Sequence, residues 1–433
     1  MRTLTGVGAW ILCVFLAACS REGDTADRAA TPGPEVTADA VRAHVMALAS
    51  DALEGRGAGY AGEAKAAAYI EQRFREAGLE TSIQTFRFAP RSPERAGDVL
   101  VSRNVLAVLP GSAPTLRLEA IMLGAHYDGQ GRAGQADGGR LRALEKASAE
   151  DAIWNSADDN ASSVAAVLEI ARVLAQGSTR PKRTIIFAAF GAEEHALNGS
   201  AHLADNPWPA GIRVGAMVNV EKIGRVPEQP LIMAGCSSSS AWAELRRRTQ
   251  DRTGQDVECL LPELIPDTDH YPFAAVGIPA VVLGIAHEED THRPTDDPWR
   301  LDFEALARRA AYVRQLVEIL AGIERLPPFD PAARRGTGLM VVTASESERS
   351  ALNMGDHGAL KVSALMPGLP AASAGIRVGE MITMLDDRLL EPDVQERVIH
   401  ERVAANGRAD VTIQRGRELI SLTLTEERND EEN

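Results

Sequence analysis

The chain alternates segments of helical periodicity with short apolar runs. Residues 60–79 are rich in alanine and end near Gly78, which favours a helix with a glycine stop. In two further segments, residues 161–175 and 301–323, the apolar residues lie along one face of a helix. Four apolar runs end in polar residues, as strands covered on both faces do, and they are residues 119–128, 184–194, 214–224 and 277–287. This order predicts an α/β fold with a mostly parallel sheet sandwiched by helices.

Changes in composition and periodicity divide the chain into parts. Residues 36–325 carry the alternating pattern, and residues 326–335 are a proline-bearing linker without periodicity. Residues 336–427 contain short runs such as ALKVSAL and LISLTLTEE, which predict a small β-rich domain. Residues 428–433 form an acidic tail.

The N-terminus, MRTLTGVGAWILCVFLAACS, is typical of a targeting segment. Residues 1–18 have a basic start and an apolar stretch too short to span a bilayer comfortably. LAAC at Leu16–Cys19 resembles a bacterial lipobox, in which Cys19 is lipidated, and residues 19–35 would then be a tether. This predicts a lipid-anchored protein of the bacterial cell envelope that faces the periplasm or the cell surface. An ordinary signal peptide with a chance cysteine is the alternative.

The net charge limits the possible classes of partner, and the cysteine content bears on the cellular compartment. The formal charge of −15 argues against a nucleic-acid partner, which requires a basic patch. Cys236 and Cys259 are the cysteines left in the folded body, and an oxidising compartment permits them to pair. The sequence leaves that pairing open.

The predicted strands end in residues that can bind metals. Glu193 and Glu194 are adjacent carboxylates, which repel each other unless positive charge compensates them. Other polar residues at such ends are His126, Asp128, Asp158, Asp159, Asn160, Glu221 and His292. The carboxyl ends of parallel strands are where ligands gather in open α/β sheets. Imidazole and carboxylate together suit zinc, and two divalent cations would supply the missing charge.

Five motifs in order resemble one family of enzymes. HYD, ADDNAS, GAEEHALNGS, NVEKIG and HRPTDD look like the M28 family of di-zinc aminopeptidases, over roughly residues 36–325. The resemblance implies a zinc-exopeptidase-like fold and two Zn²⁺ per chain. It also implies peptide substrates, from which a zinc-activated water removes N-terminal residues.

The resemblance also implies a role for each matching residue. His126 and Glu221 would ligate one metal, Glu194 and His292 the other, and Asp159 would bridge both. Glu221 departs from the family, which usually has aspartate there. Two catalytic residues remain: Glu193 would be the general base and Asp128 the acid that orients the His126 ring.

A second set of residues is expected near the substrate. Asp269 and His270 match a family segment close to the active site, and His287 precedes His292 by five residues, where the family usually has four. These three are candidates for the substrate pocket.

The C-terminal segment resembles a PDZ domain. PAASAGIRVGEMI matches a common signature of these domains, which bind extended peptides by strand addition. Gly338 and Leu339 are the expected loop for a peptide C-terminus.

Two other functions remain open at this point. Glutaminyl cyclases resemble this fold but bind a single zinc and catalyse acyl transfer. The chain could also be a non-catalytic peptide-binding protein that acts through its PDZ-like domain.

Overall fold

The computed structural model describes residues 34–90, 98–133, 151–261, 268–285 and 289–330, and then 337–344, 346–354, 357–365, 370–377, 379–391, 394, 398–416 and 418–425. The predicted signal peptide, the lipidation site Cys19, the pocket candidate His287 and the acidic tail lie outside the described residues. Within these ranges, no helix combines the length and the apolar character needed to cross a bilayer.

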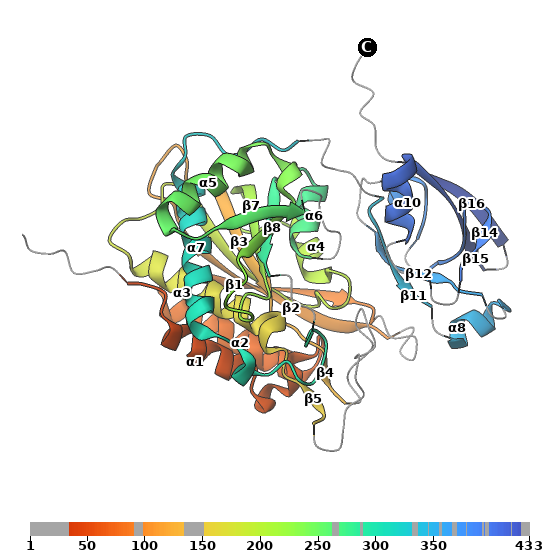
Figure 1. Cartoon of the computed structure of the whole chain (residues 1–433), viewed down its shortest axis with the longest axis horizontal. Helices are drawn as coiled ribbons and strands as arrows, with labels where there is room; N and C mark the ends of the chain where they lie inside the picture. Colours follow the sequence, from red (N-terminus) through yellow and green to blue (C-terminus); the bar gives the residue numbers. More distant parts are fainter. Residues whose placement is uncertain are drawn as a thin grey trace, which may run out of the picture. The chain divides into compact units, whose positions relative to one another are not determined.

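An eight-stranded sheet forms the centre of the larger part of the chain (Figure 1). From one edge to the other, its strands are β1 (Glu80–Phe88), β2 (Leu100–Leu109), β6 (Thr184–Phe190), β3 (Glu119–His126), β7 (Arg213–Glu221), β10 (Ala280–Gly284), β8 (Leu231–Ala234) and β9 (Val257–Leu261). The four central strands β6, β3, β7 and β10 run parallel. However, β1 pairs antiparallel with β2, β2 with β6, and β8 with β10. The sheet is therefore mixed: neighbouring strands run parallel in the centre and in the β8–β9 pair, and the prediction of a mostly parallel sheet is wrong at the three antiparallel pairs. β1 and β2 follow each other without the helix that a parallel connection needs.

Helices cover both faces of this sheet. One face packs against α1 (Ala38–Leu48), α2 (Ala61–Glu76), α3 (Ser163–Gln176), α5 (Ala241–Thr253) and α7 (Phe303–Gly322). The other face packs against α4 (Asn198–Asp205) and α6 (His270–Ala275). Strand β6 contributes to both layers, because Ile185, Phe187 and Ala189 join one core cluster and Ile186, Ala188 and Phe190 join the other. This confirms the prediction of a strand buried on both faces.

Short elements connect the layers near the carboxyl ends of the central strands. They are η1 (Asp51–Arg56), β4 (Gly131–Arg132), β5 (Ile153–Trp154), the wide-turned helix η3 (Ala157–Ser162) and η5 (Pro298–Arg300). Another short element, η4 (Cys236–Ser238), follows β8 and lies at the amino end of β10, where the Ser238 hydroxyl contacts Ala280. Cys236 and Cys259 form a disulfide with their Cα atoms 6.5 Å apart. The pairing that the sequence left open therefore joins the segment after β8 to its neighbour β9.

The C-terminal part has a sheet and a core of its own. Its strands are β11 (Leu339–Thr343), β12 (Leu360–Leu365), β13 (Met381–Leu385), β14 (Arg388–Leu389), β15 (Arg408–Arg415) and β16 (Glu418–Thr425). They follow the order β11-β12-β13-β15-β16, with β14 on β13. Its helices are α8 (Glu346–Ala351), α9 (Pro370–Ser373) and α10 (Val398–Asn406). The prediction of a β-rich domain is confirmed, and its identity as a PDZ domain stays a prediction.

Candidate metal centre

The predicted ligands come together at the carboxyl ends of the central parallel strands. His126 is the last residue of β3 and Glu221 the last residue of β7. Glu193 and Glu194 lie in the turn after β6, and His292 lies in the segment that follows β10. Asp159 is contributed by η3 at the start of α3. Since parallel strands end at the same edge of a sheet, residues distant in sequence reach one place.

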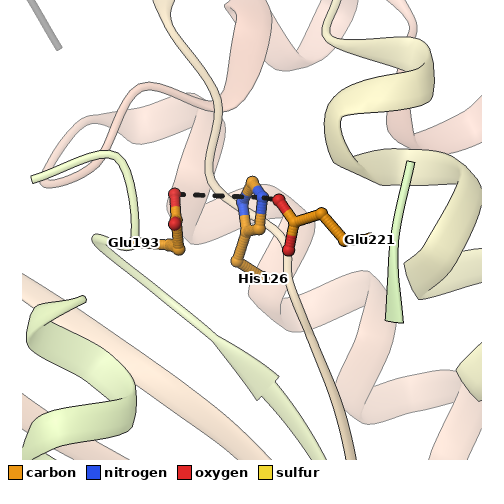
Figure 2. Close-up of side chains that lie close together, drawn as sticks. All are labelled: His126, Glu193 and Glu221. Atoms are coloured by element: carbon orange, nitrogen blue, oxygen red, sulfur yellow. Dashed lines mark hydrogen bonds and ion pairs between the residues drawn. The ribbon is translucent and has the colours of Figure 1, made fainter. Parts of the chain in front are cut away.

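The side chains form two groups of three. His126, Glu193 and Glu221 form one group, which Figure 2 shows with the imidazole ring between the two carboxylates. Asp159, Glu194 and His292 form the other group. Within each group the potential ligand atoms all lie within 4.8 Å of one another.

Asp159 connects the two groups. Its Oδ1 lies 3.2 Å from Nε2 of His126, and its Oδ2 lies 3.3 Å from Nε2 of His292. Burial alone would raise the pKa of Asp159, but contacts with the two histidines hold this pKa well below its usual value. Asp159 is thus an ionised carboxylate that presents one oxygen to each group.

The spacing of these atoms suits zinc. Two ligands of a tetrahedral zinc, each about 2.0–2.2 Å from the ion, lie about 3.3–3.6 Å apart. Nε2 of His126 lies 3.2 Å from Oε1 of Glu221, and Nε2 of His292 lies 3.2 Å from Oε2 of Glu194. The second oxygen of Glu194 is buried without a hydrogen-bond partner, as a metal-facing lone pair would be. The donor set and its spacing therefore fit zinc in both groups.

Electrostatics show that this centre favours positive charge. Burial lowers the pKa of His126, yet the charges of Glu193 and Glu221 outweigh burial and raise it well above its usual value. The pKa of His292 is likewise raised well above its usual value, because Glu194 and Asp159 outweigh burial. Divalent cations would provide that charge without protonating the ligands.

Glu193 stands slightly apart from the other carboxylates. Its Oε2 lies 3.9 Å from Nε2 of His126, compared with 3.2 Å for the nearest oxygen of Glu221. Burial raises the pKa of Glu193 well above its usual value, and the neighbouring charges of Glu221 and Glu194 add to this shift. A carboxylate beside the ligands with a raised pKa is a stronger base than an exposed glutamate and is suited to accept a proton.

Asp128 lies beside His126 in a different way than the sequence suggested. The Nδ1 atom of His126 is 3.2 Å from the main-chain oxygen of Asp128 and 3.8 Å from its carboxylate. The carboxylate instead accepts hydrogen bonds from the main-chain amides of Glu193, at 3.0 Å, and Glu194, at 3.2 Å. The backbone of Asp128 therefore makes the shorter contact with the ring, and its side chain holds the glutamate pair.

The pocket candidates Asp269 and His270 are fully buried. Asp269 begins α6, and its charge contributes to the raised pKa of Glu193. The Nδ1 atom of His270 lies 2.5 Å from the Thr268 hydroxyl, and burial lowers the pKa of His270 to about 3. The place of these two residues in a substrate pocket stays a prediction.

Two buried residues that the sequence did not single out support the centre. Arg56 donates hydrogen bonds to four main-chain carbonyls. Asp296 accepts hydrogen bonds from the main-chain amides of Asp158 and Asp159. Asp296 lies in the HRPTDD motif, but its two amide partners are 137 and 138 positions away in the sequence. Three of the four partners of Arg56, namely Tyr127, Asn155 and Ser156, are 71 to 100 positions away.

Comparisons with known proteins agree with this centre. Residues 104–317 match the sequence model of Peptidase family M28. A probable zinc metalloprotease of Pyrenophora teres f. teres (strain 0-1) is 29% identical over 192 residues, which are 42% of this chain and 35% of the relative. The chain thus spans about a third of that relative's length.

Solved structures share the fold of the larger part. BSAP, a zinc aminopeptidase from Bacillus subtilis, aligns with a TM-score of 0.54 and 18% identity over 68% of this chain and 97% of its own. The glutaminyl cyclase of Porphyromonas gingivalis aligns with a TM-score of 0.53 and 20% identity over 66% of this chain and 99% of its own. At this level of identity the two similarities establish a common fold and do not separate the two chemistries.

Proposed function

We propose that the protein is a zinc-dependent aminopeptidase that hydrolyses N-terminal residues from peptides with two zinc ions. The observation that carries this proposal is the Asp159 carboxylate, with one oxygen 3.2 Å from His126 and the other 3.3 Å from His292. A shared carboxylate between two histidine-containing groups is the arrangement that two adjacent metal ions require.

Each residue of the centre has a proposed task. His126, Glu221 and Asp159 would hold one zinc, and Asp159, Glu194 and His292 would hold the other. Bound zinc would polarise the peptide carbonyl and make a water molecule more acidic. Glu193 takes the proton from the attacking water and delivers it to the leaving amine, which its position beside the ligands and its raised pKa support.

We infer the direction of cleavage from the similarity to known peptidases. The M28 segment and the similarity to a zinc aminopeptidase favour an exopeptidase. Removal of N-terminal residues is therefore favoured over removal of C-terminal residues.

The test is a peptide panel with metal content measured on the same sample. The full chain is assayed on matched peptides with a free N-terminus, an acetylated N-terminus or an amidated C-terminus. We expect cleavage of the first and third peptides, no cleavage of the second, and about two zinc ions per chain. Cleavage of the acetylated peptide at an equal rate would contradict an aminopeptidase.

A second candidate is a glutaminyl-cyclase-like acyltransferase, because glutaminyl cyclases share the fold. This alternative predicts a single zinc per chain and cyclisation of peptides that begin with glutamine. Mass spectrometry separates the two reactions, because cyclisation releases ammonia and leaves the chain length unchanged, whereas hydrolysis shortens the peptide.

For the C-terminal part we propose binding of peptide C-termini. Strand β11 is at one end of the strand order, so an extended peptide could pair with it. Gly338, with φ +66°, immediately precedes Leu339 at the start of this strand, where a carboxylate-binding loop would lie. A fluorescent peptide with a free C-terminus should bind more tightly than its amidated form. Binding without any hydrolysis by the full chain would instead favour a non-catalytic peptide-binding protein.

The proposed location is the bacterial cell envelope, with a lipid on Cys19 as the membrane anchor. LAAC at Leu16–Cys19 is the sequence feature behind this proposal. The Cys19→Ser variant should leave the membrane fraction and appear in the soluble fraction of a bacterial host. An unchanged distribution would contradict lipid anchoring.

A further inference from the structure

We propose that the two metal groups load as a coupled pair, because two buried aspartates clamp the ligand-bearing segments of the groups to each other. The inference rests on the proposed two-zinc function and concerns Asp128 and Asp296, which act as positioning residues. Asp128 shares a segment with His126 and holds the backbone of Glu194, a ligand of the opposite group. Asp296 shares a segment with His292 and holds the backbone of Asp159, the carboxylate that both groups share.

The first clamp connects the His126 segment to Glu194. Asp128 lies two residues after His126 and is fully buried. Its two carboxylate oxygens accept the amides of the consecutive residues Glu193, at 3.0 Å, and Glu194, at 3.2 Å. Glu194 contacts His292 of the second group. The segment of the first histidine therefore fixes a ligand of the second group.

The second clamp connects the His292 segment to Asp159. Asp296 lies four residues after His292 and is only 2% exposed. Its Oδ1 accepts the amide of Asp158 at 2.9 Å, and its Oδ2 accepts the amide of Asp159 at 3.0 Å. The main-chain oxygen of Asp296 also accepts the amide of Ala157 at 3.0 Å. The segment of the second histidine therefore fixes the backbone of Asp159, the carboxylate that also contacts His126 of the first group.

Together the two aspartates connect each ligand group to the other, and this affects how tightly each group binds its metal. A cation that fixes His292 also fixes, through Asp296, the orientation of Asp159 toward His126. A cation that fixes His126 also fixes, through Asp128, the position of Glu194 beside His292. Each occupied group thus reduces the conformational freedom that the other must lose, which is positive coupling between sites. Repulsion between two cations acts in the opposite direction, so unclamped groups would fill one after the other.

The test counts bound zinc ions chain by chain. Metal-free protein is mixed with one equivalent of Zn²⁺, and native mass spectrometry measures the fractions that carry none, one and two ions. Two equal and independent sites would leave about half of the chains with one ion. We expect less than that fraction in the wild type, because doubly loaded and empty chains predominate.

The Asp296→Asn variant removes one acceptor oxygen and turns an N–H toward the main-chain amides. We expect its one-zinc fraction to rise above that of the wild type, and its second zinc to bind about 10–100-fold more weakly. Asp302→Asn is the matched control, because Asp302 also accepts a main-chain amide, that of Ala305 at 2.7 Å, but outside the centre. This control should retain the wild-type distribution.

The outcomes separate the inference from the proposed function. A wild type that takes up two zinc ions but shows mainly one-zinc chains at one equivalent would overturn the coupling and leave the two-zinc function intact. Equal distributions for Asp296→Asn and Asp302→Asn would also overturn it. A wild type that never exceeds one zinc per chain would overturn the proposed function itself. If Asp296→Asn does not fold, Asp128→Asn tests the other clamp, and the wild-type distribution still decides.

Discussion

The Nε atom of Arg56 donates a hydrogen bond to the main-chain oxygen of Tyr127 across 2.7 Å, although 71 positions separate the two residues. The same guanidinium binds the carbonyls of Leu48, Asn155 and Ser156 at 2.6–2.9 Å. Burial lowers the pKa of Arg56 to about 10, so it stays charged at neutral pH. One buried cation therefore joins the segment after His126 to the segment before η3.

Replacing Arg56 with lysine should destabilise the protein strongly. An ammonium has three donors and cannot satisfy four carbonyls in this geometry, which leaves buried acceptors unpaired. We expect a loss of at least about 3 kcal/mol in the free energy of unfolding. Urea unfolding measures it, with Arg247→Lys as the control.

Arg247 pairs with Glu244 and Asp251 on the exposed surface of α5. Its replacement should change stability little, because exposed ion pairs contribute little. Similar effects of the two substitutions would contradict the structural role of Arg56.

Glu193→Gln should lose activity and keep its metal. The amide cannot accept the proton of the attacking water, so kcat should fall by about 10²–10⁴-fold. Zinc content should stay near the wild-type value, because Glu193 lies farther from His126 than Glu221 or Asp159 does. Glu244→Gln, on the exposed surface of α5, controls for the loss of one carboxylate. A variant with wild-type kcat would remove Glu193 from the mechanism.

The pH dependence of stability should reveal the buried carboxyl of Glu63. Burial raises the pKa of Glu63 to about 7, even though Ser102 and the Gly59 amide donate hydrogen bonds to it. Because the folded pKa is above the unfolded value, this contribution to stability is complete below about pH 4.5 and disappears as pH rises through about 7. Its loss amounts to the order of 3 kcal/mol.

Glu63→Gln therefore should remove this part of the pH dependence. Its melting temperature relative to the wild type should rise between about pH 5 and pH 9, because only the wild type must ionise a buried carboxyl. Glu76→Gln, an exposed position on the same helix, is the matched control. A constant difference between Glu63→Gln and the wild type would contradict the assigned pKa.

The disulfide should stabilise the β8–β9 edge of the sheet. Cys236 and Cys259 are separated by 23 positions, and a cross-link of that span stabilises a fold by about 3 kcal/mol through restriction of the unfolded chain. The Cys236→Ser/Cys259→Ser double variant should show this loss in urea unfolding. A reducing agent should lower the stability of the wild type and leave the double variant unchanged. A wild type insensitive to reduction would contradict a stabilising bridge.

Local sequence pattern was sufficient for the elements that carry the ligands. The apolar run 184–190 predicted a strand buried on both faces, and β6 is fully buried. Its polar neighbours, and those after β3 and β7, were predicted at one edge of the sheet because parallel strands share their carboxyl ends. The antiparallel pairs at the edges were not predicted, because pairing direction depends on which strands meet rather than on the periodicity of either one.

The sequence by itself determined which chemical groups would gather and, through the order of strands and helices, at which edge of the fold. The tertiary structure alone decided how each group is held. Asp128 contacts His126 through its main chain and directs its carboxylate to the Glu193–Glu194 amides. Arg56 and Asp296 have partners in segments that are remote in sequence. The physical reason is that periodicity reports local burial, whereas hydrogen bonds between distant segments exist only after the layers have packed.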